Sequence, residues 1–414
     1  MQQFENQQGL IFSADQLFSV ECFDDVIEAY LGASADVMSK LTVLLEQDPD
    51  MPMAHCFKAY LMKLGSDPRL LGAMDDAIER LKVMRPTLND RETRHLAALA
   101  YWSDNQSKDT IRIIEELLTL YPHDILALRI NHHLHFYSGD APAMRDSVNR
   151  VMPHWQQDGR FFNYILGMQA FGLEESGDYK QAEISGRQAV EANPRDLWAT
   201  HALVHVMQMQ ERFDDGINWL TPLLPKWSNT NNFIFHLHWH NALFHIGKNQ
   251  HNEALEIYDN FLEAPINDDF YLDVCNGAAL LWRLERLGVD VGRRWDALAA
   301  LSSQRIKDTE LVFCSLHYLL TPIRLNQQKV INAAMRSMSQ WATVDSTQGR
   351  IAAEVGLPVA NAMVELGTKN YRNSAKILTG VAQRLHEIGG SHAQRHLFIQ
   401  MQEFAQQQTN ASSY

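Results

Sequence analysis

Cysteine is scarce in this sequence, and the few cysteines form no pattern. Cys22, Cys56, Cys275 and Cys314 are the four in 414 residues, and no two of them make a C-x-x-C pair. This spacing argues against a disulfide framework and against a zinc knuckle, because both need cysteines at close or regular intervals. We therefore expect a reduced, cytoplasmic setting.

Long apolar runs and clustered positive charge are also missing. No uncharged apolar run approaches the roughly 20 residues that span a bilayer. Residues 1–8 contain no positive segment followed by an apolar one, which predicts no signal peptide. The net charge is −14, and no stripe of Lys and Arg interrupts it. Since nucleic acid and anionic membrane surfaces attract clustered positive charge, we expect neither as a partner.

The short motifs of several common enzyme classes are absent. The chain contains no G-x-x-x-x-G-K loop, no G-x-G-x-x-G fingerprint, no G-x-S-x-G elbow and no full H-E-x-x-H. No segment shows the alternation of β-branched and polar residues that is typical of strands. The sequence thus predicts an all-α chain and does not indicate a particular reaction.

What the sequence does contain is a series of helical segments. Leu17, Val20, Phe23, Ile27 and Leu31 follow one another at spacings of three or four, which places them on one helix face. Similar patterns predict helices over 15–31, 35–47, 53–64, 78–84, 90–102, 107–120, 181–192, 273–287, 308–325, 328–341, 347–366, 371–387 and from about 391 onward. We expect residues 219–227, with their two prolines, to be partly non-helical.

Three turns share a proline at the same phase. Pro49, Pro122 and Pro194 are separated by 73 and 72 residues. Proline ends a helix because it cannot donate a backbone hydrogen bond and disfavours helical geometry in the residue before it. Asp124 and Asp196 follow two of these prolines and are expected to cap the next helix.

A shorter repeat lies within this pattern. Tyr179 and Phe213 occupy equivalent turns 34 positions apart, which is the repeat length of tetratricopeptide (TPR) arrays. Turns at Gly139, Gly177, Gly247 and Gly367 each place glycine where a helix can stop with positive φ. We expect one TPR-like helical array (α-solenoid) over residues 1–414, with an arm at 1–14 and a flexible tail at 405–414. The less regular C-terminal third is a candidate to close the array.

Histidines are the candidate chemistry. Twelve of the 18 lie between His123 and His251. Residues four apart share a helix face, so the pairs His201/His205 and His236/His240 can each direct two imidazoles to one point. Two such pairs are suitable ligands for a divalent transition metal, and Glu175 is a candidate carboxylate donor. The alternative is that these histidines hydrogen-bond to one another, to carbonyls or to buried water.

Other residues complete the predicted ligand site. We expect His132 to point inward and His133 to lie on the surface, and we place His317 near the histidine pairs. The helix start at Gly389-Gly390-Ser391-His392 has free amides that suit an anion, with Arg395 one turn further on. An ordinary serine cap is the competing interpretation of this segment.

The chain resembles the tetratricopeptide repeat protein 38 family. The segments that carry the resemblance are 144–148, 171–173 with Tyr179, Asn193-Pro194, His201, His205, His236, Trp239-His240, Ala242-Leu243, 281–284, Gly288-Val289, Val291-Gly292, 355–358, 388–391 and 393–395. The resemblance implies a TPR-like helical array and carries over no catalytic residues. The chain departs from the family pattern at His133, Met207, Gln208 and Cys314-Ser315.

Two functions remain open from the sequence. The first is a TPR-like binding protein that offers a concave, His-rich pocket to a peptide, protein or small-molecule ligand. The second is a metal-dependent enzyme that uses His201, His205, His236 and His240, with His132 or His317 nearby. A purely structural role for the histidines is the third reading. The oligomeric state does not follow from the sequence.

Overall fold

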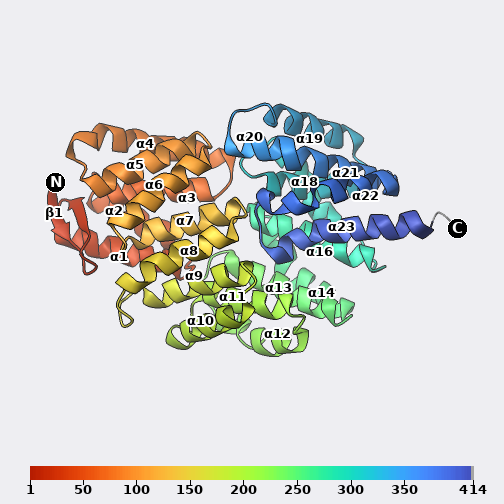
Figure 1. The fold of residues 1–414 in the computed structure, drawn as a ribbon, viewed down its shortest axis with the longest axis horizontal. Coiled ribbons are helices and arrows are strands. Elements are labelled where there is room, and N and C mark those ends of the chain that lie inside the picture. Colours follow the sequence, from red (N-terminus) through yellow and green to blue (C-terminus); the bar gives the residue numbers. More distant parts are fainter. Residues whose placement is uncertain (412–414) are drawn as a thin grey trace. The chain divides into compact units, whose positions relative to one another are not determined.

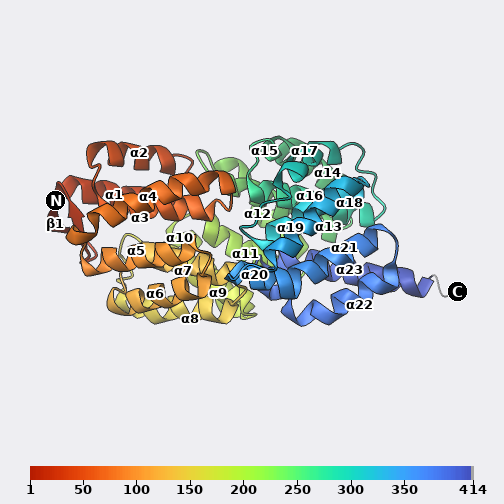
Figure 2. The same cartoon turned by 90° about the horizontal axis from the view of Figure 1, so that it is seen from above.

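The predicted all-α class is confirmed. A computed structural model describes residues 1–411, and Figures 1 and 2 show that almost all of its regular structure is helical. Its residues group into two compact units. Unit 1 comprises Met1–Phe136, Ala141–Val206 and Trp227–Phe233, and unit 2 comprises Tyr137–Asp140, Met207–Lys226 and Ile234–Tyr414. The expectation of a single array stays a prediction.

Unit 1 holds a two-stranded hairpin and the first helices. Its elements are β1 (Gln2–Glu5), β2 (Ile11–Ala14), α1 (Leu17–Leu31), α2 (Val37–Gln47), α3 (Pro52–Leu64), α4 (Leu71–Met84), α5 (Asp90–Ser103), α6 (Ser107–Leu120), α7 (Ile125–Tyr137), α8 (Ala141–Val151), α9 (Phe162–Glu175), α10 (Tyr179–Ala192) and α11 (Leu197–Met209). Helix α7 ends one residue beyond the boundary of unit 1, and helix α11 ends three residues beyond it.

The regular secondary structure of unit 2 is helical in its described residues. Its elements are α12 (Phe213–Leu220), α13 (Phe233–Gly247, which begins at the boundary), α14 (His251–Ile257), α15 (Glu263–Ile266), α16 (Tyr271–Arg286), α17 (Trp295–Arg305), α18 (Val312–Arg324), α19 (Gln328–Trp341), α20 (Thr347–Ile351), α21 (Leu357–Gly367), α22 (Tyr371–Val381) and α23 (His392–Ala411).

Consecutive helices pack as pairs joined by short turns. In unit 1 the pairs are α1/α2, α3/α4, α5/α6 and α9/α10, and in unit 2 α21 packs on α22 in the same way. Helices α2, α6 and α10 each end two residues before one of the three in-phase prolines. Asp124 and Asp196 then cap α7 and α11, because their carboxylates accept from the amides of Ala127 and Ala199, both at 2.9 Å. The predicted helix ends before the prolines and the two aspartate caps are confirmed.

The expectation of no strands is wrong at the N-terminus. Strands β1 and β2 form an antiparallel hairpin in which Phe4 pairs with Phe12. The Asn6 side chain accepts from the amides of Gln8 and Leu10, which closes the turn. Each strand has only four residues, and a run that short does not show a reliable alternation.

This hairpin is fastened to helix α5. The amide and hydroxyl of Ser13 both donate to the Glu92 carboxylate at 2.8 Å. Glu92 also completes the capping box of α5 with Asn89. Arg91 donates to the carbonyl of Ile11 at 3.0 Å. The expected arm at 1–14 is therefore a docked hairpin whose partners lie about 80 residues away in sequence.

Two long helices are interrupted where the sequence predicts continuity. The segment 347–366 contains a π-helical turn at Ala352–Gly356 between α20 and α21. The segment 371–387 is α-helical to Val381 and continues as a 3₁₀ helix over Ala382–Ile388. Both changes alter which residues are joined by backbone hydrogen bonds, but the chain stays helical. Apolar periodicity alone therefore does not reveal them. In the predicted flexible tail, α23 is helical through Ala411 with Ala405 buried, and residues 412–414 lie outside the described part.

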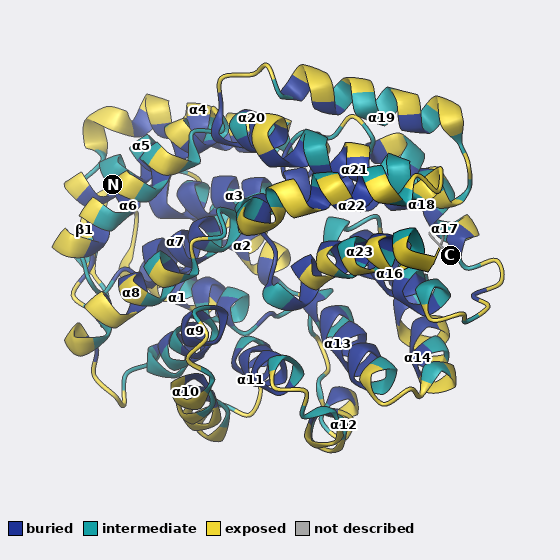
Figure 3. Cartoon of the chain, turned by 45° about the vertical axis from the view of Figure 1, so that its right-hand side comes forward, coloured by how far each residue is buried: buried dark blue, intermediate teal, exposed yellow. Residues whose placement is uncertain are grey.

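Each unit has its own apolar core. In unit 1 the core includes Phe57 and Leu128, and in unit 2 it includes Leu316 and Trp295. Figure 3 shows that many helices bury one side and expose the other, as amphipathic helices do. Within the described residues, none of the helices has both the length and the apolar character that crossing a membrane requires.

Candidate functional site

Helices α11 and α13 carry the four histidines predicted as metal ligands. His201 and His205 lie on α11, and His236 and His240 lie on α13. All four are buried, at 5% exposure or less, and could serve as ligands of a metal ion. Helix α11 starts at the Asp196 cap, whose burial raises the pKa of that carboxyl to about 7.

The pair on α11 is in direct contact. Nε2 of His201 and Nε2 of His205 are 2.9 Å apart, and the ring centres are 4.3 Å apart. The ring of Phe171 packs against both imidazoles at 5.3 and 5.4 Å. The four-residue spacing on a helix therefore does what the sequence predicts, since it brings the two nitrogens to one point.

Two carboxylates from α9 face the other nitrogen of His205. Nδ1 of His205 lies 3.4 Å from Oε2 of Glu174 and 3.7 Å from Oε1 of Glu175. Glu174 and His205 are both fully buried. An ionised carboxylate only accepts hydrogen bonds, so this contact favours a proton on Nδ1 and a lone pair on Nε2. Glu175 was predicted from the sequence, whereas Glu174, which lies nearer, was missed.

The pair on α13 is arranged similarly within unit 2. The ring centres of His236 and His240 are 4.7 Å apart. His236 stacks on Trp239 with 5.2 Å between ring centres and 14° between planes. Nδ1 of His236 lies 3.1 Å from the side-chain amide nitrogen of Asn276 on α16. Asn276 was not predicted, because a single buried amide carries no spacing signal.

His132 is buried as expected, but no nitrogen contact links it to the pair on α11. Its ring packs on Phe171 at 5.9 Å between centres. Burial, and then the charge of Arg129, lower the pKa of His132 well below its ordinary value. His133, expected on the surface, is instead half-buried with its ring 5.8 Å from Trp198. Both rings are therefore packed against aromatic side chains of unit 1.

His317 is held by its own helix in unit 2. Its Nδ1 donates to the carbonyl of Phe313 at 2.8 Å, and its ring lies 4.2 Å from that of Phe313 and 5.6 Å from that of Phe398. Burial lowers the pKa of His317 to about 4. The imidazole is therefore neutral at physiological pH and packs as an aromatic ring.

The segment 389–395 contains a serine cap. The hydroxyl of Ser391 accepts from the amide of Gln394 at 3.3 Å, and Oε1 of Gln394 accepts from the amide of Ser391 at 2.9 Å. The guanidinium of Arg395 donates to the carbonyl of Gly390, and His392 is half-buried. The serine cap expected as the alternative is present, and binding of an anion at this helix start stays a prediction.

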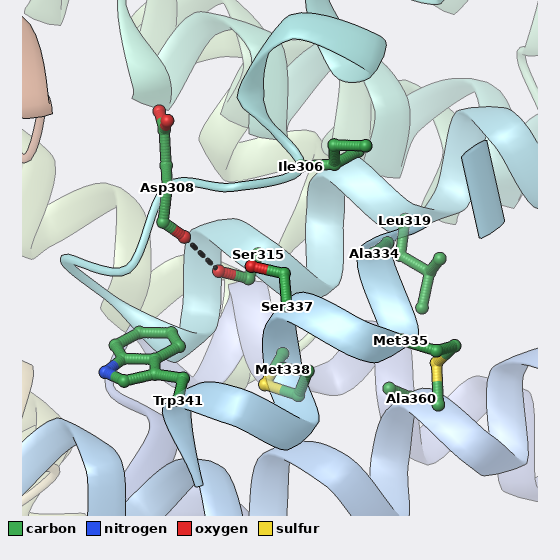
Figure 4. Close-up of a pocket in the computed structure, with 10 residues that line it drawn as sticks. All are labelled: Ile306, Asp308, Ser315, Leu319, Ala334, Met335, Ser337, Met338, Trp341 and Ala360. Carbon is green, nitrogen blue, oxygen red and sulfur yellow. Dashed lines mark hydrogen bonds between the residues drawn. The ribbon is translucent and has the colours of Figure 1, made fainter. Parts of the chain in front are cut away.

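Two hollows of unit 2 lie away from the predicted residues. Figure 4 shows a cavity of about 10 Å³ beside Trp341 and Met338, where the Ser315 hydroxyl donates to the Asp308 carbonyl at 3.0 Å. This volume holds about one water molecule. An open hollow of about 420 Å³ lies at α19 and α21 and is lined by Met335, Arg336, Ser339, Gln340, Leu357 and Asn361. No predicted ligand-binding residue lines either of them.

Comparison with known families does not extend these observations. The resemblance to the tetratricopeptide repeat protein 38 family therefore stays an expectation from the sequence. No protein-family model matches this chain.

Proposed function

We propose that this protein binds a divalent transition metal through the imidazoles of His201 and His205 and of His236 and His240. The observation that carries the proposal is the arrangement around His205. One ring nitrogen of His205 meets another imidazole at 2.9 Å, while the other faces the buried carboxylate of Glu174 at 3.4 Å. Carboxylate–histidine pairs of this kind orient the ligands of metal sites in proteins.

The distance between the two nitrogens is compatible with shared binding of one ion. Two imidazole nitrogens bound at about 2.0–2.1 Å to one ion, at a right angle, would be about 2.9 Å apart. A direct hydrogen bond between two neutral imidazoles has a similar length. The two cases differ in the proton, because the metal requires a lone pair on Nε2 of both His201 and His205.

The pair on α13 needs one adjustment to act in the same way. If the Asn276 amide presents its oxygen to Nδ1 of His236, that nitrogen carries the proton and the lone pair is on Nε2. Amide oxygen and nitrogen exchange by a simple flip of the side chain, so the 3.1 Å contact allows this arrangement.

Metal content tests the proposal directly. We expect near-stoichiometric metal in protein purified without a His tag, and its loss in His205→Ala and in His240→Ala. His245→Gln is the matched control, because His245 lies on α13 but bonds to the exposed Gln250 at 2.8 Å. One ion per chain, lost in either variant, would mean that both pairs bind the same ion. Glu174→Gln should weaken metal affinity about 10- to 100-fold with the fold intact.

The contrary result is equally clear. Absence of metal in the purified protein, together with no rise in melting temperature on adding zinc, iron, manganese or nickel, would exclude the site. A bound metal raises the melting temperature by mass action when it binds only the folded state. Circular dichroism of each variant separates loss of metal from loss of fold.

Metal-dependent catalysis is the second candidate, and the two buried glutamates favour it. A carboxylate beside a metal ligand is the usual general base for a metal-activated water. The helix pairs support the other sequence-based reading, in which a TPR-like protein binds a peptide, protein or small molecule. If the metal-loaded and the metal-free protein hydrolyse ester, phosphate and peptide probes at the same rate, that result would favour the binding role.

A further inference from the structure

Two arginines at the C-terminal end of α16, Arg283 and Arg286, have no acidic partner among residues 1–411. Arg283 is 3% exposed. Its guanidinium donates from Nε to Gln400 at 3.1 Å, from Nη1 to the Ala279 carbonyl at 3.2 Å and from Nη2 to the Ala393 carbonyl at 3.0 Å. All three acceptors are neutral. Within the part of the chain that the structure describes, neither Arg283 nor Arg286 forms an ion pair with a carboxylate.

Several N–H groups of these arginines are not used. A guanidinium has five N–H donors, so the three bonds of Arg283 leave two. The Nε of Arg286, one turn further along α16, is buried and has no hydrogen-bond partner among the described residues. The two positive charges also repel each other. Burial, and then Arg286, lower the pKa of Arg283 to about 9.

Aromatic and basic groups of unit 2 lie near Arg283. Arg283 lies over the ring of Trp239, 5.6 Å from its centre, and Trp239 in turn stacks on His236. The charge of Arg283 also acts on His317 and His396, lowering the pKa of each in addition to burial. The nearest acidic residue on α16, Glu285, is paired with Arg324 at 2.7 Å. Glu403 and Glu211 act in the opposite direction on the pKa of His396, but among the described residues neither of them forms an ion pair with Arg283 or Arg286.

A purely structural role explains only part of this arrangement. Arg283 joins α16 to α23 through its bonds to Gln400 and Ala393, and a cation is favoured at a helix C-terminus. Neither reason requires a second arginine with a buried, unused Nε. Burying positive charge without a counter-ion is costly, and a bound anion would remove that cost.

We propose that Arg283 and Arg286 bind the oxyanion of a small ligand, a carboxylate or a phosphoryl group. Arginine suits such groups because its planar fork matches two oxygen atoms at once. The site lies within unit 2 and depends on no metal. It would supply the charged contact for an acidic ligand, beside the aromatic ring of Trp239.

Thermal unfolding with inorganic phosphate and with malonate tests the site. Each anion is compared with potassium chloride at equal ionic strength, in protein as purified and after chelation of metal. We expect wild type and Arg293→Gln to gain melting temperature with anion concentration, and Arg286→Gln to require at least tenfold more anion for the same gain. Arg293 is the control because its side chain is 93% exposed and is paired with Asp296.

The two anions identify the ligand class. A gain with phosphate alone assigns a phosphoryl group, and a gain with malonate alone assigns a carboxylate. Equal gains in wild type and Arg286→Gln, or no gain beyond that from chloride, would overturn the proposal. Arg283→Lys keeps the charge but loses the fork, and should also weaken binding. If it does not fold, Arg286→Gln decides the question, because Arg286 is only half-buried.

Discussion

Asp24 is a buried carboxylate held against the N-terminal hairpin. It is 7% exposed, and the side-chain amide of Asn6 donates to both of its oxygens at 3.2 and 3.3 Å. A cavity of about 10 Å³ lies beside it, with Arg91 and Asp124 also in the lining. Burial raises the pKa of Asp24 to about 6, while Asn6, Arg160 and Arg91 act in the opposite direction. Between pH 3.8 and about 6, the folded state therefore keeps a proton that the unfolded chain has lost.

This raised pKa predicts the pH dependence of one variant. Because the folded pKa is above the ordinary value of 3.8, the stability that Asp24 contributes is present below that value and is lost as pH rises through about 6. Asp24→Asn should be more stable than wild type at pH 7.5, by about 1–3 kcal/mol, and should approach it near pH 4. Urea unfolding at pH 4, 5, 6 and 7.5 measures this.

A neighbouring residue provides the control for this variant. Asp25 is exposed and paired with Arg160, so Asp25→Asn should not reproduce the change between pH 4 and 7.5. A wild type whose difference from Asp24→Asn stays constant with pH would show that Asp24 does not titrate in this range.

At the scale of helices, two of the four predicted glycine stops work by a different mechanism. Gly139 and Gly177 have φ of +67° and +84°, as predicted. Gly247 and Gly367 do not have positive φ; Asn249 and Lys369, two residues later, take that conformation instead. A Cβ on Gly247 would lie 2.6 Å from the Phe213 ring. Glycine is needed at 247 because the preceding helix, α12, packs too closely for a side chain.

Gly247→Ala should therefore destabilise the protein through packing. We expect a loss of about 1–3 kcal/mol, since the ring of Phe213 must move. Gly380→Ala in α22 is the matched control, because a Cβ there meets nothing within 4 Å. That substitution should be neutral or should stabilise by up to about 1 kcal/mol through helix propensity. Equal effects of the two changes on chemical unfolding would contradict the packing explanation.

For the whole molecule, the two apolar cores predict where a core defect will be felt. Leu128 in unit 1 and Leu316 in unit 2 are both fully buried. Each Leu→Ala change should cost about 2–5 kcal/mol. Leu316→Ala should accelerate hydrogen exchange mainly in α16 and α18, and Leu128→Ala mainly in unit 1. Uniform acceleration along the chain in both variants would mean that the two cores unfold as one.

Local rules account for the parts of the fold that the sequence predicts well. The ends of α2, α6 and α10, and the caps at Asp124 and Asp196, follow from chemistry within a few residues of each proline. The contact between His201 and His205 follows from helix geometry alone. These features need no knowledge of distant residues.

Tertiary structure decided the features that depend on distant partners. The hairpin is held in place by Glu92 and Arg91 of α5. A strand of four residues is too short to be recognised from its sequence pattern. Glu174 and Asn276 meet histidines on other helices, so no spacing in the sequence reveals them. The unpaired charge of Arg283 is visible only once its neighbours are known. The sequence alone determined the helices, the turns and the spacing of the histidines, because these features are local. Tertiary packing determined which residues the histidines contact, because it brings together residues that are far apart in the chain.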